Sequence, residues 1–289
     1  MVVPAVLSQR PATEADRSRL ANLLHFETYV HRHLDWRRPL DWLGHDPYLI
    51  AENSGQLVAA LACSPDLPEV SWVRLFATAA GMRPTDAWDL LWPAATPILR
   101  QKEIHTLAAI PLQDWFETLL ARSGFIKDHE VVVLEWRPQP LQTSVQEIDA
   151  DLRPMTQEDL PLVAEVDHAA FRPLWRNSLS ALEAAFSQAG LASVVEQGGR
   201  IVAYQISTHS ARGPHLARLA THPSHQGRGH AATLVRHVQT HVLQRGDTLL
   251  TVNTQDNNGA SLALYKKLGF NFNGEQFPVY QYDCTSGAD

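Results

Sequence analysis

Two kinds of hydrophobic spacing alternate along the first half of the chain. The apolar residues within 20–24 lie three and four positions apart, as on one face of a helix, and Thr13 precedes them as a candidate N-cap. Short apolar runs follow at 48–51 and 57–62, and the turn between them carries Gly55. Runs of this length around a glycine-bearing turn predict a β-hairpin.

The second half repeats this order. Thr156 precedes helical spacing at 160–166, and apolar runs at 192–196 and 201–207 flank a Gly198-Gly199 turn. Each half then continues with a strand leading into a helix, followed by a strand, a helix and a final strand. We expect these last three elements at 106–110, 113–121 and 130–136, and at 248–252, 259–267 and 277–284. The pattern predicts an α/β protein (an α+β mixed sheet), in which each half is a mostly antiparallel sheet flanked by helices.

Three short motifs recur at a nearly constant separation, which indicates a duplicated domain. They are Arg-Pro-x-Thr-x-x-Asp at 10–16 and 153–159, Gly-x-x-Val-Ala at 55–59 and 199–203, and Gly-Phe at 124–125 and 269–270. The segment 137–144 is the proline- and polar-rich bridge between the copies. We therefore expect a first domain at 1–137, a linker at 138–147 and a second domain at 148–289.

Composition narrows the class of protein. The chain has 289 residues, a formal charge of −7 and 45% hydrophobic residues, a globular profile with too little positive charge for sequence-independent nucleic-acid binding. Cys63 and Cys284 are too few for a disulfide framework, so we expect a cytoplasmic protein. The first 16 residues lack the features of a signal peptide, and no run approaches the ~18 apolar residues of a membrane span. We expect neither nucleic-acid nor membrane partners.

Candidate chemistry is concentrated at 216–234. An apolar run at 216–220, with Arg218 as its one polar insertion, predicts a strand, and Pro223 marks the turn after it. The segment Gln226-Gly-Arg-Gly-His-Ala231 then leads into a helical pattern. A strand, a glycine-bearing loop and a helix start form an arrangement that binds phosphate through backbone N–H groups. The loop has neither the Gly-Lys-Ser/Thr of a Walker loop nor the third glycine of a dinucleotide fingerprint.

Two motifs carry a family resemblance. The pattern Gln-x-x-Gly-x-Ala at 226–231, after a strand ending in His-Pro, resembles the acyl-CoA pyrophosphate loop of the GNAT superfamily of N-acetyltransferases. The segment 258–270, with Asn258, Tyr265 and a final Gly-Phe, resembles the second signature of that family at the expected distance. The resemblance implies tandem GNAT domains, of which the second is similar to ribosomal-protein-alanine-type acetyltransferases, and acetyl-CoA (coenzyme A) as the cofactor.

The resemblance also implies site residues. Tyr265 matches the general acid that protonates the CoA sulfur, although it could instead be a core tyrosine. Asn258 matches the residue at the start of that helix, where its alternative role is an N-cap. The backbone N–H groups of 226–231 would hold the pyrophosphate, and the strand at 219–221 would lie along the pantetheine arm. The expected cofactor-binding residues are therefore Leu219, Ala220, Thr221, Gln226, Gly227, Arg228, Gly229, His230, Ala231, Asn258 and Tyr265.

The general base and the acceptor are less defined. Asn253 occupies the position at which related enzymes often carry a glutamate, and it cannot take a proton. His215 is the preferred candidate over His209 and over His222, which we expect to be structural, while a water relay or an already neutral amine would need no protein base. Phe171 and Trp175 are candidates to cover the acceptor, with helix packing as the alternative.

The first half is expected to have lost the chemistry. At the position of the glycine loop it has Pro84, which lacks an N–H, and Asp86, whose charge opposes an anion. Leu120 stands at the position of Tyr265. His237 and His241 are four residues apart, but no further ligand motif supports a metal site, so none is expected.

These observations predict an acyl-CoA N-acyltransferase. Its second domain would transfer an acetyl group from acetyl-CoA to a primary amine of a small molecule, peptide or protein by direct attack. A longer acyl chain is the alternative within this class. A non-catalytic acyl-CoA sensor or scaffold is the alternative from another class. For either function we expect a monomer or a homodimer.

Overall fold

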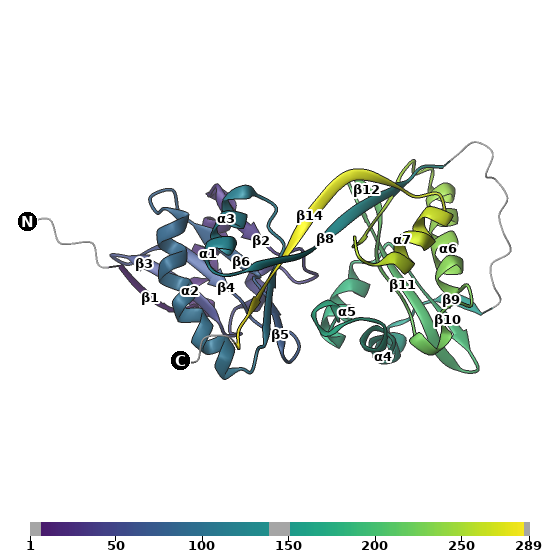
Figure 1. Cartoon of the computed structure of the whole chain (residues 1–289), viewed down its shortest axis with the longest axis horizontal. Helices are drawn as coiled ribbons and strands as arrows, with labels where there is room; N and C mark the ends of the chain where they lie inside the picture. Colours follow the sequence, from purple (N-terminus) through teal and green to yellow (C-terminus); the bar gives the residue numbers. More distant parts are fainter. Residues whose placement is uncertain (1–6, 139–150, 286–289) are drawn as a thin grey trace, which may run out of the picture. The chain divides into compact units, whose positions relative to one another are not determined.

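A computed structural model describes residues 7–138 and 151–285 (Figure 1). The chain divides into two compact units, one formed by Met1–Asp128 with Pro278–Asp289 and the other by His129–Phe277. Within each, helices cover both faces of a mostly antiparallel sheet, as the hydrophobic pattern predicts.

The first unit is built on the sheet β1-β3-β4-β6-β2. Neighbouring residues of β3 enter opposite cores, because side chains alternate across a strand: Leu49 packs under α2 and α3, and Ile50 packs under α1. Strand β5 pairs separately, in parallel, with β7. The elements are β1 (Leu7–Pro11), α1 (Arg17–Phe26), β2 (Tyr29–Arg32), β3 (Tyr48–Asn53), β4 (Gln56–Ala62), β5 (Val70–Trp72), β6 (Leu75–Thr78), α2 (Pro84–Gln101), β7 (Thr106–Ala109) and α3 (Asp114–Arg122), with short 3₁₀ turns η1 (Glu14–Asp16) and η2 (Pro39–Trp42).

The second unit is built on the order β8-β13-β12-β11-β10-β9. Helices α4 and α5 lie on one face of this sheet, and α6 and α7 pack against the other through a common apolar core. The elements are β8 (Ile126–Trp136), β9 (Leu152–Pro154), α4 (Leu160–Ala170), α5 (Leu179–Ser187), β10 (Leu191–Gln197), β11 (Arg200–Ser210), β12 (Gly213–Thr221), α6 (His230–Arg245), β13 (Leu250–Gln255), α7 (Gly259–Lys267) and β14 (Asn271–Asp283), with 3₁₀ turns η3 (Gln157–Asp159), η4 (Pro173–Trp175) and η5 (Pro223–His225).

The repeated Arg-Pro-x-Thr-x-x-Asp motif forms the same ion pair in both units. Arg10 binds Asp16 at 2.8 Å, and Arg153 binds Asp159 at 2.7 Å. In each unit the aspartate also accepts from the backbone N–H of the motif threonine, three residues earlier, which closes the turn before the first helix. The repeat therefore encodes a structural lock at the start of each copy.

Each unit is completed by a strand from the other half of the sequence. Residues 131–136 of β8 pair along the whole of β13 in the second unit. The end of β14 pairs with β7 in the first unit, from Tyr280↔Ala109 to Asp283↔Thr106. In Figure 1 these strands are teal and yellow. The domain boundaries expected from the sequence, at 137 and 148, place residues 129–137 in the first domain and residues 278–289 in the second. In the structure, residues 129–137 belong to the second compact unit, and residues 278–289 belong to the first. The expected linker, except Pro138, lies outside the described residues.

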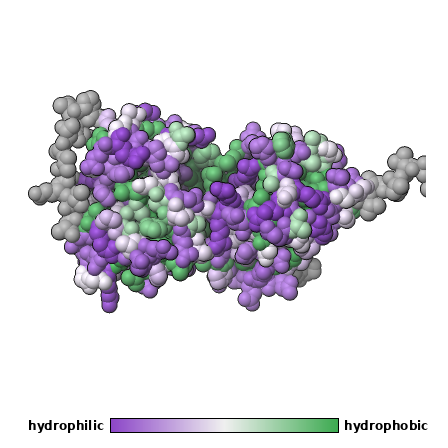
Figure 2. All heavy atoms as spheres, turned by 180° about the vertical axis from the view of Figure 1, so that it is seen from behind, coloured by the Kyte–Doolittle hydropathy of each residue, from purple (hydrophilic) through white to green (hydrophobic). Residues whose placement is uncertain are grey.

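Figure 2 shows where hydrophobic side chains lie on one face of the molecule. On the face shown in Figure 2, they lie among hydrophilic ones on both units. The most exposed include Phe26, Ile126 and Phe272. Within the described ranges, the helices are too short or too polar to span a membrane.

Candidate active site

Strand β12 lies between β11 and β13 but pairs with β13 over only two residues. The parallel pairing joins His215 to Thr251 and Leu216 to Val252. Pairing of β12 with β11 continues to Thr221, and β13 pairs with β8 along its whole length. The two central strands therefore diverge after Leu216. Beyond that point, one edge of β12 faces no paired strand in the part of the chain that is described.

The ladder between β11 and β12 decides which backbone groups point into this opening. The N–H of His222 donates to the carbonyl of Val202 at 2.8 Å. Hydrogen-bonded and non-bonded pairs alternate along an antiparallel ladder, so Leu219 and Thr221 stand at non-bonded positions. Their N–H groups point away from β11 and into the opening. A bulge leaves Ala217 without a partner on β11 just before this segment.

After η5 the chain enters an exposed loop of four residues, 226–229. Gly227 and Gly229 have φ angles of 75° and 92°, a left-handed conformation that residues with side chains rarely adopt. Gly229 is the N-cap of α6, no side chain caps this helix, and no acidic residue lies in its first turn. The first N–H groups of α6 thus lack an intrahelical partner, and the positive end of the helix dipole is uncompensated. This loop is suited to binding an anion.

Two buried polar atoms flank the loop. Oγ1 of Thr221 and Nε2 of His230 have no hydrogen-bond partner among the described residues. The Thr221 carbonyl accepts from Nε2 of Gln226 at 3.2 Å, which ties the end of β12 to the loop. Buried polar groups are normally hydrogen-bonded, so a polar ligand fits this place. The predicted residues at 219–221 and 226–231 are thus brought together around the end of β12.

Helix α7 carries both residues taken from the second motif. Tyr265 is 4% exposed, and its ring lies 5.5 Å from that of Phe270, centroid to centroid. Burial raises the pKa of Tyr265 above its usual range, so the phenol keeps its proton at neutral pH. Its hydroxyl has no hydrogen-bond partner within the described ranges. Asn258 is the N-cap: its Oδ1 accepts from the Ser261 N–H at 3.1 Å.

His215 lies on the face of β12 opposite Leu216, which is buried under α6 and α7. Its Nδ1 lies 2.8 Å from Oγ1 of Thr251, and this hydroxyl donates to the carbonyl of Pro214 at 3.5 Å. Nδ1 is thus engaged with the Thr251 hydroxyl, and no hydrogen bond occupies Nε2 within the described residues. Burial lowers the pKa of His215. The ring is therefore neutral at pH 7 and able to accept a proton.

The other candidates for a general base have different surroundings. His209 pairs with Pro214 at the start of β12, before the strands diverge, and lies 3.3 Å from a carboxylate oxygen of Asp247. His222 accepts from the Ser224 N–H and caps η5, a structural role. Asn253 is exposed on β13 beside the opening and offers no titratable group.

Phe171 and Trp175 lie on the connection between α4 and α5, which includes η4. The guanidinium of Arg218, on β12, lies 3.6 Å from the centroid of the Phe171 ring and donates to the Trp175 carbonyl at 2.6 Å. Sequence reasoning treated Arg218 only as a polar interruption and missed its partner Asp167, which is fully buried. The available signal was a charged residue inside an apolar run, because such a residue needs a buried partner.

Comparison with known protein families adds a sequence match to this description. The model of the acetyltransferase (GNAT) family matches residues 151–270. The second unit is a GNAT acetyltransferase domain. Among curated proteins, none matches the sequence significantly.

Solved structures extend the GNAT fold to the whole chain. A tandem GNAT protein from the clavulanic acid biosynthesis pathway is 16% identical, with a TM-score of 0.64 over 98% of this chain and 100% of its own. A GCN5-related N-acetyltransferase from Sphaerobacter thermophilus is 16% identical, with a TM-score of 0.59 over 98% and 97%. A probable N-acyltransferase from Enterococcus faecalis V583 is 8% identical, with a TM-score of 0.72 over 97% and 73%. At these identities the likeness concerns the fold alone: two units of the GNAT fold in tandem.

The first unit, which has the same fold, differs at the strand edge that is open in the second. Strand β6 corresponds to the end of β12, and β2 pairs with β6 over its whole length. The N–H of His33 donates to the Arg74 carbonyl at 3.0 Å, which sets the alternation of this ladder. The N–H groups of Phe76 and Thr78, equivalent to the two open groups of β12, therefore point to β2 and are paired with it.

The equivalent helix start of the first unit is also less suited to an anion. Helix α2 begins at Pro84, and Asp86 lies in its first turn. Arg83 binds Asp86 at 2.8 Å and lowers its pKa, so the carboxylate is charged at neutral pH. Leu120, in the position of Tyr265, is buried. Among the described residues of the first unit, the edge of β6 is thus paired and the start of α2 carries a compensating acidic residue.

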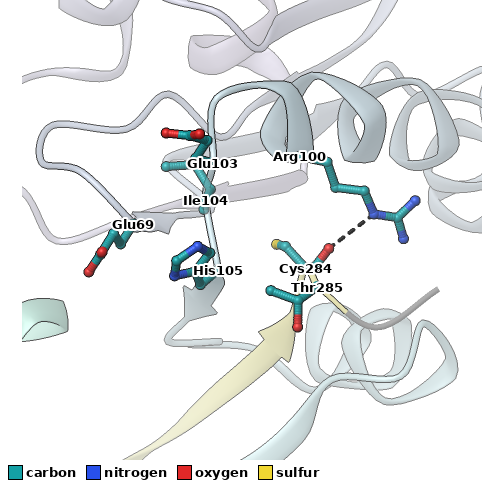
Figure 3. A pocket seen from close by; sticks show the side chains of 7 residues that line it. All are labelled: Glu69, Arg100, Glu103, Ile104, His105, Cys284 and Thr285. Atoms are coloured by element: carbon teal, nitrogen blue, oxygen red, sulfur yellow. Dashed lines mark hydrogen bonds between the residues drawn. The ribbon is translucent and has the colours of Figure 1, made fainter. Parts of the chain in front are cut away.

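A cavity of about 440 Å³ in the first unit lies apart from these features (Figure 3). Arg100 borders it and donates from Nε to the Cys284 carbonyl at 3.0 Å. Its remaining lining residues are Glu69, Glu103, Ile104, His105 and Thr285. None of the sequence-predicted site residues lines this cavity.

Proposed function

We propose that the second GNAT unit transfers an acetyl group from acetyl-CoA to a primary amine by direct attack. The observation that carries this proposal is the open edge of β12 beside the glycine loop. It supplies two outward N–H groups, from Leu219 and Thr221, next to a helix start that favours an anion. An extended amide-containing arm that ends in a pyrophosphate matches these donors along its length.

The residues of the second unit would divide the work as follows. The N–H groups from Gln226 to Ala231 hold the pyrophosphate, with the exposed Arg228 as an added charge. The N–H groups of Leu219 and Thr221 align the pantetheine arm. Leu219 follows the bulge, so its N–H is the donor we assign to the oxyanion that develops on the thioester carbonyl.

The reaction moves two protons. The amine nitrogen attacks the thioester carbonyl carbon, and the tetrahedral intermediate collapses with cleavage of the carbon–sulfur bond. The leaving thiolate takes a proton from the Tyr265 hydroxyl, which burial keeps protonated. The proton lost by the attacking nitrogen goes to Nε2 of His215, directly or through a water molecule. The products are an amide and free CoA thiol, and the two side chains exchange protons with solvent before the next cycle.

One acetyl-CoA is expected to bind per chain, because β2 occupies in the first unit the edge that is open in the second. Calorimetric titration of the full chain with acetyl-CoA measures this stoichiometry. A Gly229→Asp variant, which forces a side chain and a negative charge onto the left-handed N-cap, is the matched test and should abolish that binding. Two sites would show that the first unit also binds, and no binding would remove the enzyme proposal.

The pH dependence of the acetylation rate should show whether His215 is the general base. Because burial lowers its pKa, the neutral base persists below the usual histidine value of about 6.5, and the acetylation rate should fall only at more acidic pH. His215→Gln should lower the rate at least about 10-fold and remove this acidic limb. The assay is thiol release with spermidine, tyramine, glucosamine and an alanine-initiated peptide as candidate amines. An unchanged acidic limb in the variant would exclude His215 as the base.

A non-catalytic acyl-CoA sensor is the second candidate function, and Asn253 favours it because no carboxylate stands at that position. Such a protein would bind acetyl-CoA and release no thiol above the uncatalysed rate with any amine of the panel. Amine-dependent thiol release excludes the sensor.

A further inference from the structure

Arg218 occupies an unusual place for a charged residue. It lies on the central strand of the second unit, one residue before Leu219, and its side chain is 13% exposed. Its Nε donates to a carboxylate oxygen of Asp167 at 2.8 Å, and a terminal nitrogen donates to the Trp175 carbonyl at 2.6 Å. The guanidinium plane also covers the ring of Phe171. A planar cation with several fixed donors is suited to binding three groups at once.

Asp167 gathers the other contacts. It is fully buried at the end of α4, and besides Arg218 it accepts from the hydroxyl of Tyr204 and from the N–H of Asn177 at 2.8 Å. Asn177 lies just after η4. One buried carboxylate and one buried guanidinium therefore hold the segment 171–177 at its beginning, middle and end. We refer to this segment as the acceptor loop.

We propose that Arg218 is a positioning residue that fixes the acceptor loop against β12 and thereby sets the affinity for the amine acceptor. This inference rests on the proposed acetyl transfer. The same short stretch of β12 carries the oxyanion donor of Leu219 and the side chain that holds the loop. Arg218 holds the backbone of Trp175 through its carbonyl. The Trp175 ring also lies 5.6 Å from the ring of His129 on β8, centroid to centroid. The wall of the acceptor site is thus located relative to the thioester by Arg218.

The first unit shows that the fold itself does not need this network. Its equivalent positions are filled by apolar side chains that pack in the core under α1. These are Leu24, Ala60 and Leu75, in place of Asp167, Tyr204 and Arg218. A buried ion pair is often no more stabilising than well-packed apolar residues. The charged set is present in the unit that has an open strand edge, and there it contacts the acceptor loop. In the first unit the equivalent segment is β2.

The test compares full-length variants. Arg218→Lys keeps the charge but cannot serve Asp167 and the Trp175 carbonyl together. The triple variant Asp167→Leu/Tyr204→Ala/Arg218→Leu copies the apolar set of the first unit, so it tests the proposal even if a single substitution prevents folding. Arg153→Met is the matched control, because it breaks an Arg–Asp pair of the same unit that contacts neither β12 nor the loop.

Two measurements test whether Arg218 positions the acceptor loop. We expect both variants to raise KM for the best amine of the panel about 10-fold or more, with acetyl-CoA affinity changed less than about 3-fold, and the control to leave KM unchanged. We also expect faster hydrogen exchange at Asn177 and along 171–177 in the variants only. Equal KM values in variants and control, or unchanged exchange of the loop, would overturn the proposal. If the wild type releases no thiol with any amine, the proposed function fails, and hydrogen exchange still tests the positioning of the loop.

Discussion

Tyr265→Phe is expected to slow amine-dependent thiol release about 100-fold while leaving acetyl-CoA affinity unchanged. The substitution removes the proton that the departing thiolate takes, and general acid catalysis typically contributes at least this factor. The Tyr265 hydroxyl makes no hydrogen bond in the described structure, so its removal should also leave thermal stability nearly unchanged. Steady-state thiol release, calorimetry with acetyl-CoA and thermal unfolding are the three measurements.

A matched control is Tyr280→Phe in the first unit. The Tyr280 hydroxyl donates to Glu117 at 2.7 Å, so this variant should lose some stability but no activity. If Tyr265→Phe retains the wild-type rate, the general-acid role is excluded. If it loses acetyl-CoA binding as well, the hydroxyl contributes to the ground state rather than to protonation of the sulfur.

A fragment that begins at residue 148 should not fold into an active domain, although the family match lies within it. Without β8, strand β13 keeps only its two-residue pairing with β12, and the core under α6 and α7 loses Val132, Leu134 and Trp136. Removing a single large core side chain typically costs about 2–5 kcal/mol, against a total stability of about 5–15 kcal/mol for a domain. Circular dichroism and acetyl-CoA titration of the purified fragment measure the outcome.

The control for this prediction is a fragment that begins at residue 129, which restores β8 to the second unit. It should recover secondary structure and acetyl-CoA binding. Equal folding and binding by the two fragments would show that the exchanged strand adds nothing to the second unit.

Much of the fold follows from local sequence signals. The periodicity predicts a helix over 259–267, and α7 has these bounds. The hairpins around Gly55 and Gly198-Gly199 form where glycine permits a positive φ. The expected mixed α/β class and the tandem arrangement are confirmed. Each of these features depends on residues that are close in sequence or on the internal repeat.

The exchange of β8 and β14 could not be predicted in this way. A strand shows the same alternation of side chains whichever neighbour it pairs with, so the pattern at 130–136 fits either unit. The strand β2 was also missed. Its sequence at 29–32 mixes aromatic and charged residues, and it is a strand because β6 offers unpaired backbone groups.

The parts of the candidate site that depend on backbone conformation or on motif spacing could be predicted from the sequence. Glycines at 227 and 229 are needed for left-handed φ angles, and the motif spacing placed Tyr265 on α7. Arg218 and Asp167 were not predictable as a pair, because 51 residues separate them and only tertiary packing makes one the partner of the other. Whether the predicted cofactor and acceptor contacts form stays a prediction for the experiments above.

The closure of β6 by β2 has a consequence for mass action. A segment of the same chain competes at an effective concentration of the order of millimolar, and it is neither diluted nor released. A soluble molecule could bind the N–H groups of Phe76 and Thr78 only by displacing β2, which is covalently part of the same chain. In the first unit, the edge of β6 is therefore permanently occupied by β2, a segment of the same chain.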